Sequence, residues 1–453
     1  MAQTNTKSFL FEAMPIPKAV MELSIPMVVT SLVMVVYNLA DTFFVGMLND
    51  PVQNAAVTLA YPVMLAFNAV NNLFGIGTSS MMSRALGRGD HEMVRTSSAF
   101  GFYGAVFSGL AFALLCTVFK APLMHLLGAD ATTWQATANY MLWTVSCGAM
   151  PAILNVVQAQ MVRAEGASLH ASIGTMSGCI LNIILDPIFI LPWGLNMGAA
   201  GAGLATFLSN CAACVYFLVL ARVKKGNTFV CLDVRKLKNL SREVVFGILG
   251  VGIPASIQNL LNVTGSTILN NFTSAYGAAA VAAMGVSHKV NMLPMQVCLG
   301  FSQGIMPLVS YNYASGNRKR MKDAILFSLG IILPVMTVVT VAYWFCAPTM
   351  IQLFMDNPEI VAYGSRFLQG MCLGLVFLSV DFVAVGVFAS LGMGKYSLTF
   401  ALLRKVVLEI PLLFVLNHFF PLYGLAYAQF LAEVILAIAA VVMLVRIFRQ
   451  EGK

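Results

Sequence analysis

Twelve stretches of mostly apolar residues follow one another along this 453-residue chain. A helix needs about 20 apolar residues to cross the hydrocarbon core of a bilayer. The stretches fall at 20–47, 53–82, 96–119, 137–162, 168–191, 198–221, 244–271, 278–310, 322–346, 360–391, 397–418 and 423–446. Only short connections remain between them, so the pattern predicts an all-α polytopic membrane protein with twelve transmembrane helices.

The composition agrees with this prediction and removes several classes of protein. Hydrophobic residues make up 59% of the chain and charged residues only 10%, whereas a soluble protein carries about 25% charged residues. Nucleic-acid binding proteins, secreted disulfide scaffolds and most soluble enzymes are therefore excluded or disfavoured. The nine cysteines lie mainly in apolar stretches, where we expect them to pack as small hydrophobic residues.

The two halves of the chain repeat the same landmarks. Ser24-Ile25-Pro26 matches Gly252-Ile253-Pro254, and Leu86-Gly87-Arg88 matches Ser315-Gly316-Asn317. Further pairs, at nearly the same offset, are Ala121-Pro122 with Ala347-Pro348, Pro187 with Pro411, and Gly198 with Gly424. The repeat predicts two pseudo-symmetric six-helix lobes: an N-terminal lobe at 1–221, a cytoplasmic linker loop at 222–242 and a C-terminal lobe at 243–453.

Basic residues collect on one side of this predicted topology. When the connections are assigned to alternating sides, 23 of the 26 lysines and arginines fall on one side, with Arg404 and Lys405 counted among them. The opposite side holds Lys120 and Arg366, and Lys289 lies within a span. Because lysine and arginine accumulate on the cytoplasmic side, we expect both termini in the cytoplasm. The net charge of +8 then reflects orientation rather than a nucleic-acid partner.

Two aspartates inside spans of the first half are the main candidates for chemistry. Asp41 lies in YNLADTFFVG, with Tyr37 one helical turn earlier, and Asp186 lies in LNIILDPIF, with Asn182 one turn earlier. A charged group in hydrocarbon costs several kcal/mol, so such residues mark function. Pro187 cannot donate a hydrogen bond, which leaves a carbonyl free beside Asp186.

The second half does not repeat either aspartate. The repeat offsets place Leu269 opposite Asp41 and Ile410 opposite Asp186. Carboxylate, amide and hydroxyl oxygens suit hard cations, and Thr206 in the sixth span adds one more oxygen. The residues therefore predict ion or proton coupling in the first half.

Five sequence segments resemble the multidrug and toxic compound extrusion (MATE) transporters, particularly the MepA-like and DinF-like branches. They are SIPMVVTSLVMVVYNLADTFFVG, RAEGASLHAS, LNIILDPIFI, GAAGAGLATFLSN and GFSQGIMPLVSYNYASGNRKRMKDA. The resemblance implies twelve helices in two lobes, antiport of organic cations against H+ or Na+, no other cofactor and no enzymatic activity. It also implies an ion- or proton-coupling site, with a possible Na+ site at Asp41, Asn182, Asp186 and Thr206 beside Tyr37.

Other polar or soft residues within the spans are candidates for the substrate cavity. They are Asn38, Asn155, Gln158, Asn210, Asn262, Met292 and Asp381. Some MATE relatives carry an acid where this chain has Asn262. Glu409 and Glu433 are expected in a polar network between helices. His288 and Lys289 either line an aqueous cavity or pair with an acid such as Asp381.

Taken together, the residues and the resemblance favour a secondary multidrug exporter of the cytoplasmic (inner) membrane. The expected partners are small organic cations or drugs and the lipid bilayer, with no nucleic acid and the chain acting as a monomer. The alternatives are a flippase for lipid-linked oligosaccharides, an exporter of one physiological metabolite, or a channel. A flippase would need several basic residues in its cavity, and Lys289 is the main one available. The chain has no HExxH metalloprotease motif and no GxxxxGK[ST] phosphate-binding loop.

Overall fold

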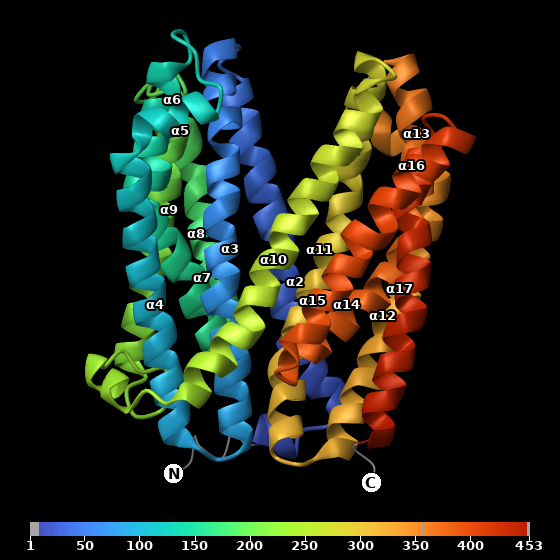
Figure 1. The fold of residues 1–453 in the computed structure, drawn as a ribbon. Coiled ribbons are helices and arrows are strands. Elements are labelled where there is room, and N and C mark those ends of the chain that lie inside the picture. The colour runs from blue at the N-terminus through green and yellow to red at the C-terminus, as the bar shows by residue number, and fades with distance from the viewer. Residues whose placement is uncertain (1–8, 355–356, 451–453) are drawn as a thin grey trace. The chain divides into compact units, whose positions relative to one another are not determined.

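The computed structural model describes residues 9–354 and 357–450, and every regular element in this part of the chain is helical (Figure 1). Lys7 and Lys453, which contribute to the predicted charge asymmetry, lie outside the described residues. The elements are α2 (Ile16–Gly46), α3 (Pro51–Gly87), α4 (His91–Val118), α5 (Lys120–Leu126), α6 (Trp134–Met141), η1 (Leu142–Cys147), α7 (Ala149–Ala164), α8 (Ser168–Ile190), α9 (Ala199–Val223), η2 (Val234–Asn239), α10 (Arg242–Ser274), α11 (Ala278–Ala314), α12 (Arg318–Gln352), α13 (Pro358–Cys372), α14 (Leu375–Ser390), α15 (Gly394–Leu402), η3 (Leu403–Glu409), α16 (Ile410–Phe419) and α17 (Gly424–Gln450).

Within the described residues, nine single helices are long and apolar enough to cross a membrane. Two further spans are bent by 45°, one formed by Trp134–Cys147 with Ala149–Ala164 and the other by Pro358–Cys372 with Leu375–Ser390. The predicted multi-pass helical class is therefore confirmed, with up to eleven candidate spans. The remaining predicted span, 397–418, is divided among α15, the π-helical turn η3 and α16.

The internal repeat appears in the backbone as well as in the sequence. Residues with a positive φ angle occur in the turns after corresponding helices of the two halves, and the two members of each pair are separated by nearly the same number of residues. The pairs are Asn49 with Gly277, Gly89 with Gly316, Gly166 with Gly392, and Asn196 with Leu422. One sequence landmark was therefore out of register, because the turn equivalent to Gly316 is formed by Gly89 rather than Gly87. Gly148 and Gly374, where the two bent spans break, form a further pair at the same offset as Gly166 and Gly392.

The described chain forms two compact units. The first unit contains Leu32–Ser256 together with the segment that ends at Ala13, and the second contains Met14–Ser31 together with the residues from Ile257 onward. Each unit thus takes one part of α2 and one part of α10. The lobe boundaries at 221 and 243 that the sequence suggests stay a prediction.

Small residues allow close helix packing in the first unit, where α8 lies beside α9 (Figure 1). The buried face of α8 repeats about every four residues through Gly174, Gly178, Asn182, Asp186 and Ile190. A side chain at position 178 would meet the Ser209 carbonyl oxygen at 3.2 Å. Glycine at this position therefore lets the two backbones approach, as small residues do between membrane helices.

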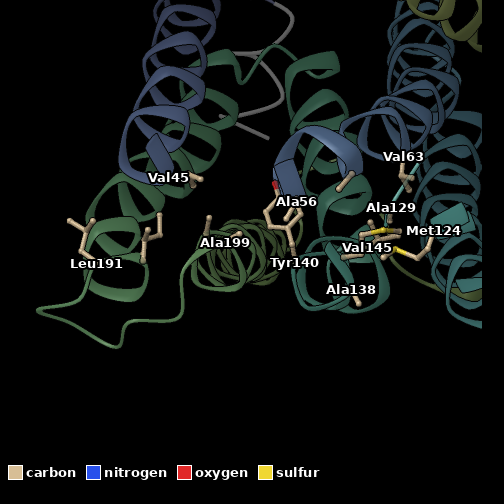
Figure 2. Packing of buried hydrophobic residues seen from close by; sticks show 14 residues of the cluster. Val45, Ala56, Val63, Met124, Ala129, Ala138, Tyr140, Val145, Leu191 and Ala199 are labelled. Atoms are coloured by element: carbon tan, nitrogen blue, oxygen red, sulfur yellow. The ribbon is translucent and has the colours of Figure 1, made fainter. Parts of the chain in front are cut away.

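An apolar cluster closes the end of the first unit where α2 ends and α3 begins. Figure 2 shows Val45, Ala56, Tyr140 and Ala199 among its buried members, which come from helices far apart in the sequence. Ile190 at the end of α8 belongs to the same cluster. The cluster therefore forms an apolar layer one helical turn from both Asp41 and Asp186.

The loop between α9 and α10 is attached to the first unit by polar contacts. The Glu165 carboxylate at the end of α7 accepts hydrogen bonds from the Phe229 backbone N–H (2.7 Å) and the Thr228 hydroxyl (2.9 Å). The Tyr103 hydroxyl donates to the Leu232 carbonyl (2.8 Å), and Lys236 pairs with Glu92 (2.7 Å). The predicted linker loop thus lies against α4 and α7.

Serine side chains join the helices of the second unit. Ser302 and Ser310 on α11 donate hydrogen bonds to the carbonyl oxygens of Phe382 and Ser390 on α14, at 2.6 and 3.0 Å. Ser287 on α11 donates to the Gly364 carbonyl on α13 (2.9 Å). Such bonds between helices position α14, which carries Asp381.

We predict that Gly198→Ala destabilises the start of α9. Gly198 has φ +58° and ψ −138°, and the next residue, Ala199, donates its N–H to the Gln53 side chain (2.8 Å). An alanine there would be strained, so we expect a loss of about 1–3 kcal/mol in unfolding free energy. Thermal unfolding of the purified protein measures the effect. Gly250→Ala is the control, because position 250 is helical and has open space around it; equal losses in both variants would contradict the prediction.

Candidate functional site

The sequence of α8 places Asn182 and Asp186 on one buried face. Residues four apart lie above one another on a helix, so these two side chains share the face formed by Gly174 and Gly178. Asp186 is completely buried and Asn182 is 1% exposed. The packing of α8 on α9 thus removes both polar groups from the surface.

Asn182 connects Asp186 to α9. Its amide is satisfied when the nitrogen donates to Asp186 Oδ2 (2.9 Å) and the oxygen accepts from the Thr206 backbone N–H (3.0 Å) and hydroxyl (3.3 Å). These bonds determine the orientation of the amide. They leave Asp186 Oδ1 without a hydrogen-bond partner in the described part of the chain.

α2 brings the remaining predicted residues to the same place. Tyr37 and Asp41 lie one turn apart on this helix, and the Tyr37 hydroxyl lies near the Thr206 side chain. The Asp41 and Asp186 carboxylates interact electrostatically. The structure therefore brings together all five residues of the predicted coupling set, from α2, α8 and α9.

Tyr140 on α6 also belongs to this cluster, although it is not among the residues predicted from sequence. It is 2% exposed, its hydroxyl contacts the Met64 sulfur at 3.5 Å, and it interacts electrostatically with Tyr37, Asp41 and Asp186. Nothing in the surrounding sequence marks this tyrosine, because it reads as one more aromatic residue of an apolar stretch.

The two aspartates lack an internal counter-charge. Among residues 9–354 and 357–450, neither Asp41 nor Asp186 forms an ion pair with lysine, arginine or histidine, and the Oδ1 atom of each is buried without a hydrogen-bond partner. Two close carboxylates in a medium of low dielectric constant repel each other strongly. A proton or a small cation would relieve this repulsion, and the oxygens of the neighbouring Tyr37 and Thr206 suit a hard cation.

A second polar group continues along α9. Asn210 lies one turn after Thr206, and the Asn155 amide on α7 donates to Asn210 Oδ1 (3.3 Å). Gln158, one turn further along α7, is buried, and its Oε1 has no hydrogen-bond partner among the described residues. Three predicted cavity candidates therefore form one polar strip with the carboxylate cluster.

Three other residues predicted to line the substrate cavity lie away from the carboxylate cluster. Asn38 is exposed on α2, and its amide donates to the Met34 carbonyl of the same helix (2.8 Å). Asn262 is exposed on α10, and Met292 is partly buried on α11. None of the three belongs to the carboxylate cluster.

The second unit contains a different buried charge cluster, and it corrects two assignments. Arg404 is paired with both Asp381 and Glu433 and is about 5% exposed, while Lys405 pairs with Glu409 at 2.7 Å. The prediction that these two basic residues belong to the cytoplasmic connections is wrong, because both lie in η3 and are ion-paired inside the helical unit. Asp381 thus pairs with Arg404, while Lys289 is exposed. The expected polar network at Glu409 and Glu433 is confirmed.

No group of three or more His, Cys, Asp or Glu residues suited to a transition metal occurs in the described ranges. All nine cysteines are free thiols. The carboxylate cluster of the first unit could therefore hold a proton or a hard monovalent cation through oxygen atoms only.

Two repeated sets of membrane helices, with acidic side chains buried among them, define a secondary transporter of the repeat-built class. Comparison with known proteins identifies the family. The MatE family model matches residues 26–188 and 254–415, one segment in each half, and the two segments begin at the prolines of the first repeated landmark. The chain is 32% identical to the multidrug export protein MepA of Staphylococcus aureus (strain MRSA252) over 438 residues, covering 96% of this chain and 95% of the relative. MepA of Staphylococcus haemolyticus (strain JCSC1435) is also 32% identical, covering 95% and 94%.

Solved structures agree in fold. An outward-facing multidrug resistance MATE transporter of the MOP superfamily has a TM-score of 0.92 and 25% identity, with 98% of both chains covered. A MOP superfamily transporter from Pyrococcus furiosus, described as having a binding pocket of reverse polarity that suggests a different function, has a TM-score of 0.91 and 25% identity, with 99% of this chain and 98% of the other covered. This chain belongs to the MATE family. It is a membrane transporter and not an enzyme.

We predict that Asn182→Leu destabilises the first unit. Leucine has a similar size but cannot donate to Asp186 or accept from Thr206, so buried polar groups lose their partners at a cost of about 1–3 kcal/mol. Thermal unfolding in detergent measures the effect. Ser177→Ala on the same helix is the control, because the Ser177 hydroxyl bonds only to the Gly174 carbonyl of its own helix. An Asn182→Leu protein as stable as the control would contradict the hydrogen-bond assignment.

Proposed function

We propose that this transporter exports chemically varied organic compounds, often lipophilic cations, from the cytoplasm in exchange for inward H+ or Na+. Family membership supports ion-coupled antiport, and the MepA relatives are multidrug export proteins. The observation that carries the proposal is the Asp41–Asp186 pair: the Oδ1 atom of each is buried without a hydrogen-bond partner, and neither carboxylate has a counter-charge within the described chain.

The pair supplies a mechanism for exchange. An ion that enters from outside offsets one of the two negative charges of Asp41 and Asp186 and lowers the cost of keeping both carboxylates inside the helical unit. Release of the ion on the cytoplasmic side restores the negative charge, which attracts a cationic substrate. Coupling arises because ion and substrate favour different charge states of one site.

The orientation of the chain in the membrane and its substrate contacts complete the proposed function. The distribution of basic residues supports a cytoplasmic location for both termini, and we propose that the chain works as a monomer in the cytoplasmic membrane. The polar strip of Asn155, Gln158 and Asn210 would supply neutral hydrogen-bonding groups to the substrate.

Asp41→Asn and Asp186→Asn each test the coupling pair. Asparagine keeps the size but removes the ionisable charge, so we expect efflux driven by an ion gradient to fall about 5- to 150-fold, the usual range of a coupling free energy. The measurement is efflux of a fluorescent cation from proteoliposomes. Asp50→Asn is the matched control, because Asp50 caps α3 outside the cluster and asparagine caps helices equally well. Full gradient-driven efflux in both cluster variants would refute the assignment.

Separate gradients identify the coupling ion. A pH gradient imposed without sodium, and a sodium gradient imposed at equal pH, are applied to the same proteoliposomes. We expect one of the two gradients to drive efflux by the wild type, and the efflux driven by that gradient to be the one that falls in Asp41→Asn. Efflux that persists without either gradient, at the same rate, would contradict antiport.

Reporter fusions test the orientation. Green fluorescent protein at the C-terminus should fluoresce in cells, whereas alkaline phosphatase at the same position should be inactive, because the latter needs export to become active. The opposite pattern would overturn the cytoplasmic placement of the C-terminus.

A further inference from the structure

The second unit holds its buried acids in a different way from the first. Asp381 on α14 and Glu433 on α17 are 1% and 0% exposed, and the Arg404 guanidinium of η3 lies between them. Its Nε atom is 3.1 Å from Glu433 Oε1, its Nη2 atom contacts Asp381 Oδ2, and its Cζ atom lies 5.1 Å from the Phe382 ring centre. Three helical elements thus surround one fixed positive charge.

In this cluster, one oxygen of Asp381 and one oxygen of Glu433 contact the cationic side chain of Arg404. We call these two buried carboxylates the carboxylate cage. Each carboxylate uses one oxygen on Arg404, and the other oxygen, Asp381 Oδ1 or Glu433 Oε2, has no hydrogen-bond partner in the described part of the chain. Oxygens from two carboxylates are ligands that a small hard cation prefers. Lys405 is occupied separately by Glu409, so Arg404 is the main counter-charge of the pair.

The repeat shows that this charge pair is specific to the second half. At the offset that relates Gly166 to Gly392, Asp381 corresponds to Asn155 and Arg404 to Gly178. The first half therefore has neutral residues at both positions. Arg404 itself lies in a π-helical turn, a local irregularity that often accompanies functional sites.

We propose that Arg404 is a tethered cation that fills a carboxylate cage in the second half and keeps it closed to Na+, so that the coupling ion binds in the first half alone. Arg404 is thus a specificity-determining residue. The consequence for coupling rests on the proposed function, whereas the closure of the cage to Na+ does not. Removing the guanidinium would leave two buried carboxylates, and one Na+ would then replace the lost positive charge.

The experiment measures binding of radioactive Na+ to purified full-length protein at alkaline pH. All variants carry Asp41→Asn and Asp186→Asn, which removes the first-half site from the measurement. With Arg404 present we expect no Na+ to bind, and with Arg404→Met about one Na+ per chain, by charge balance. Arg404→Lys is the matched control, because lysine keeps the positive charge and should keep the cage closed.

Three outcomes would overturn the inference: Na+ binding while Arg404 is present, equal binding by the Met and Lys variants, or no binding by a folded Arg404→Met protein. If Arg404→Met does not fold, adding Glu433→Gln removes one of the two uncompensated acids, and Asp381 should still bind Na+. Failure of the proposed transport function would appear separately, as absent efflux by the wild type with these binding results unchanged.

Discussion

The structure depends on how a carboxylate can be buried among membrane helices without water. An ionised side chain in this environment costs several kcal/mol unless a charge or hydrogen bonds compensate it. The second unit meets this constraint with a permanent partner, Arg404, for Asp381 and Glu433. The first unit gives Asp186 one amide donor, Asn182, and neither of its two aspartates has a basic partner among the described residues. The proposed exchange of ions with the solution therefore rests on the first unit, where no basic side chain among the described residues is fixed to the aspartates.

The duplicated scaffold makes this difference visible. Corresponding turns in the two halves recur at nearly one offset, so the helices repeat while their polar groups do not. Where the first half has Asp41, the second has Leu269, which packs in a buried apolar cluster. At the offset of the Gly166 and Gly392 turns, Asp186 corresponds to Leu412 rather than to Ile410, and Leu412 packs against the same cluster. The two halves therefore share one helical scaffold but carry their charged residues at different positions along it. Each charge must be compensated within its own unit.

Much of the candidate site could be predicted from sequence, because its signals are local. A charged residue inside an apolar stretch is conspicuous, and a spacing of four residues indicates a shared helical face for Tyr37 and Asp41 and for Asn182 and Asp186. Tyr140 and Arg404 could not be assigned in this way. Tyr140 gives no local signal, and its role depends on residues of other helices. Arg404 lies near the start of the predicted span 397–418 and so resembles a residue at a membrane boundary, whereas its partners Asp381 and Glu433 lie on two other helices, α14 and α17.

By itself the sequence determined the class of protein, the repeat and the acidic candidates, because apolar length, periodicity and scarce charge are properties of the chain read in order. The tertiary structure decided which side chains meet. It brought Asp41 to Asp186 through the packing of α2, α8 and α9, left that pair without a basic partner among the described residues, and enclosed Arg404 between two acids. The physical reason is that the cost of a buried charge depends on what surrounds it in space, and those neighbours come from helices that the linear sequence keeps apart.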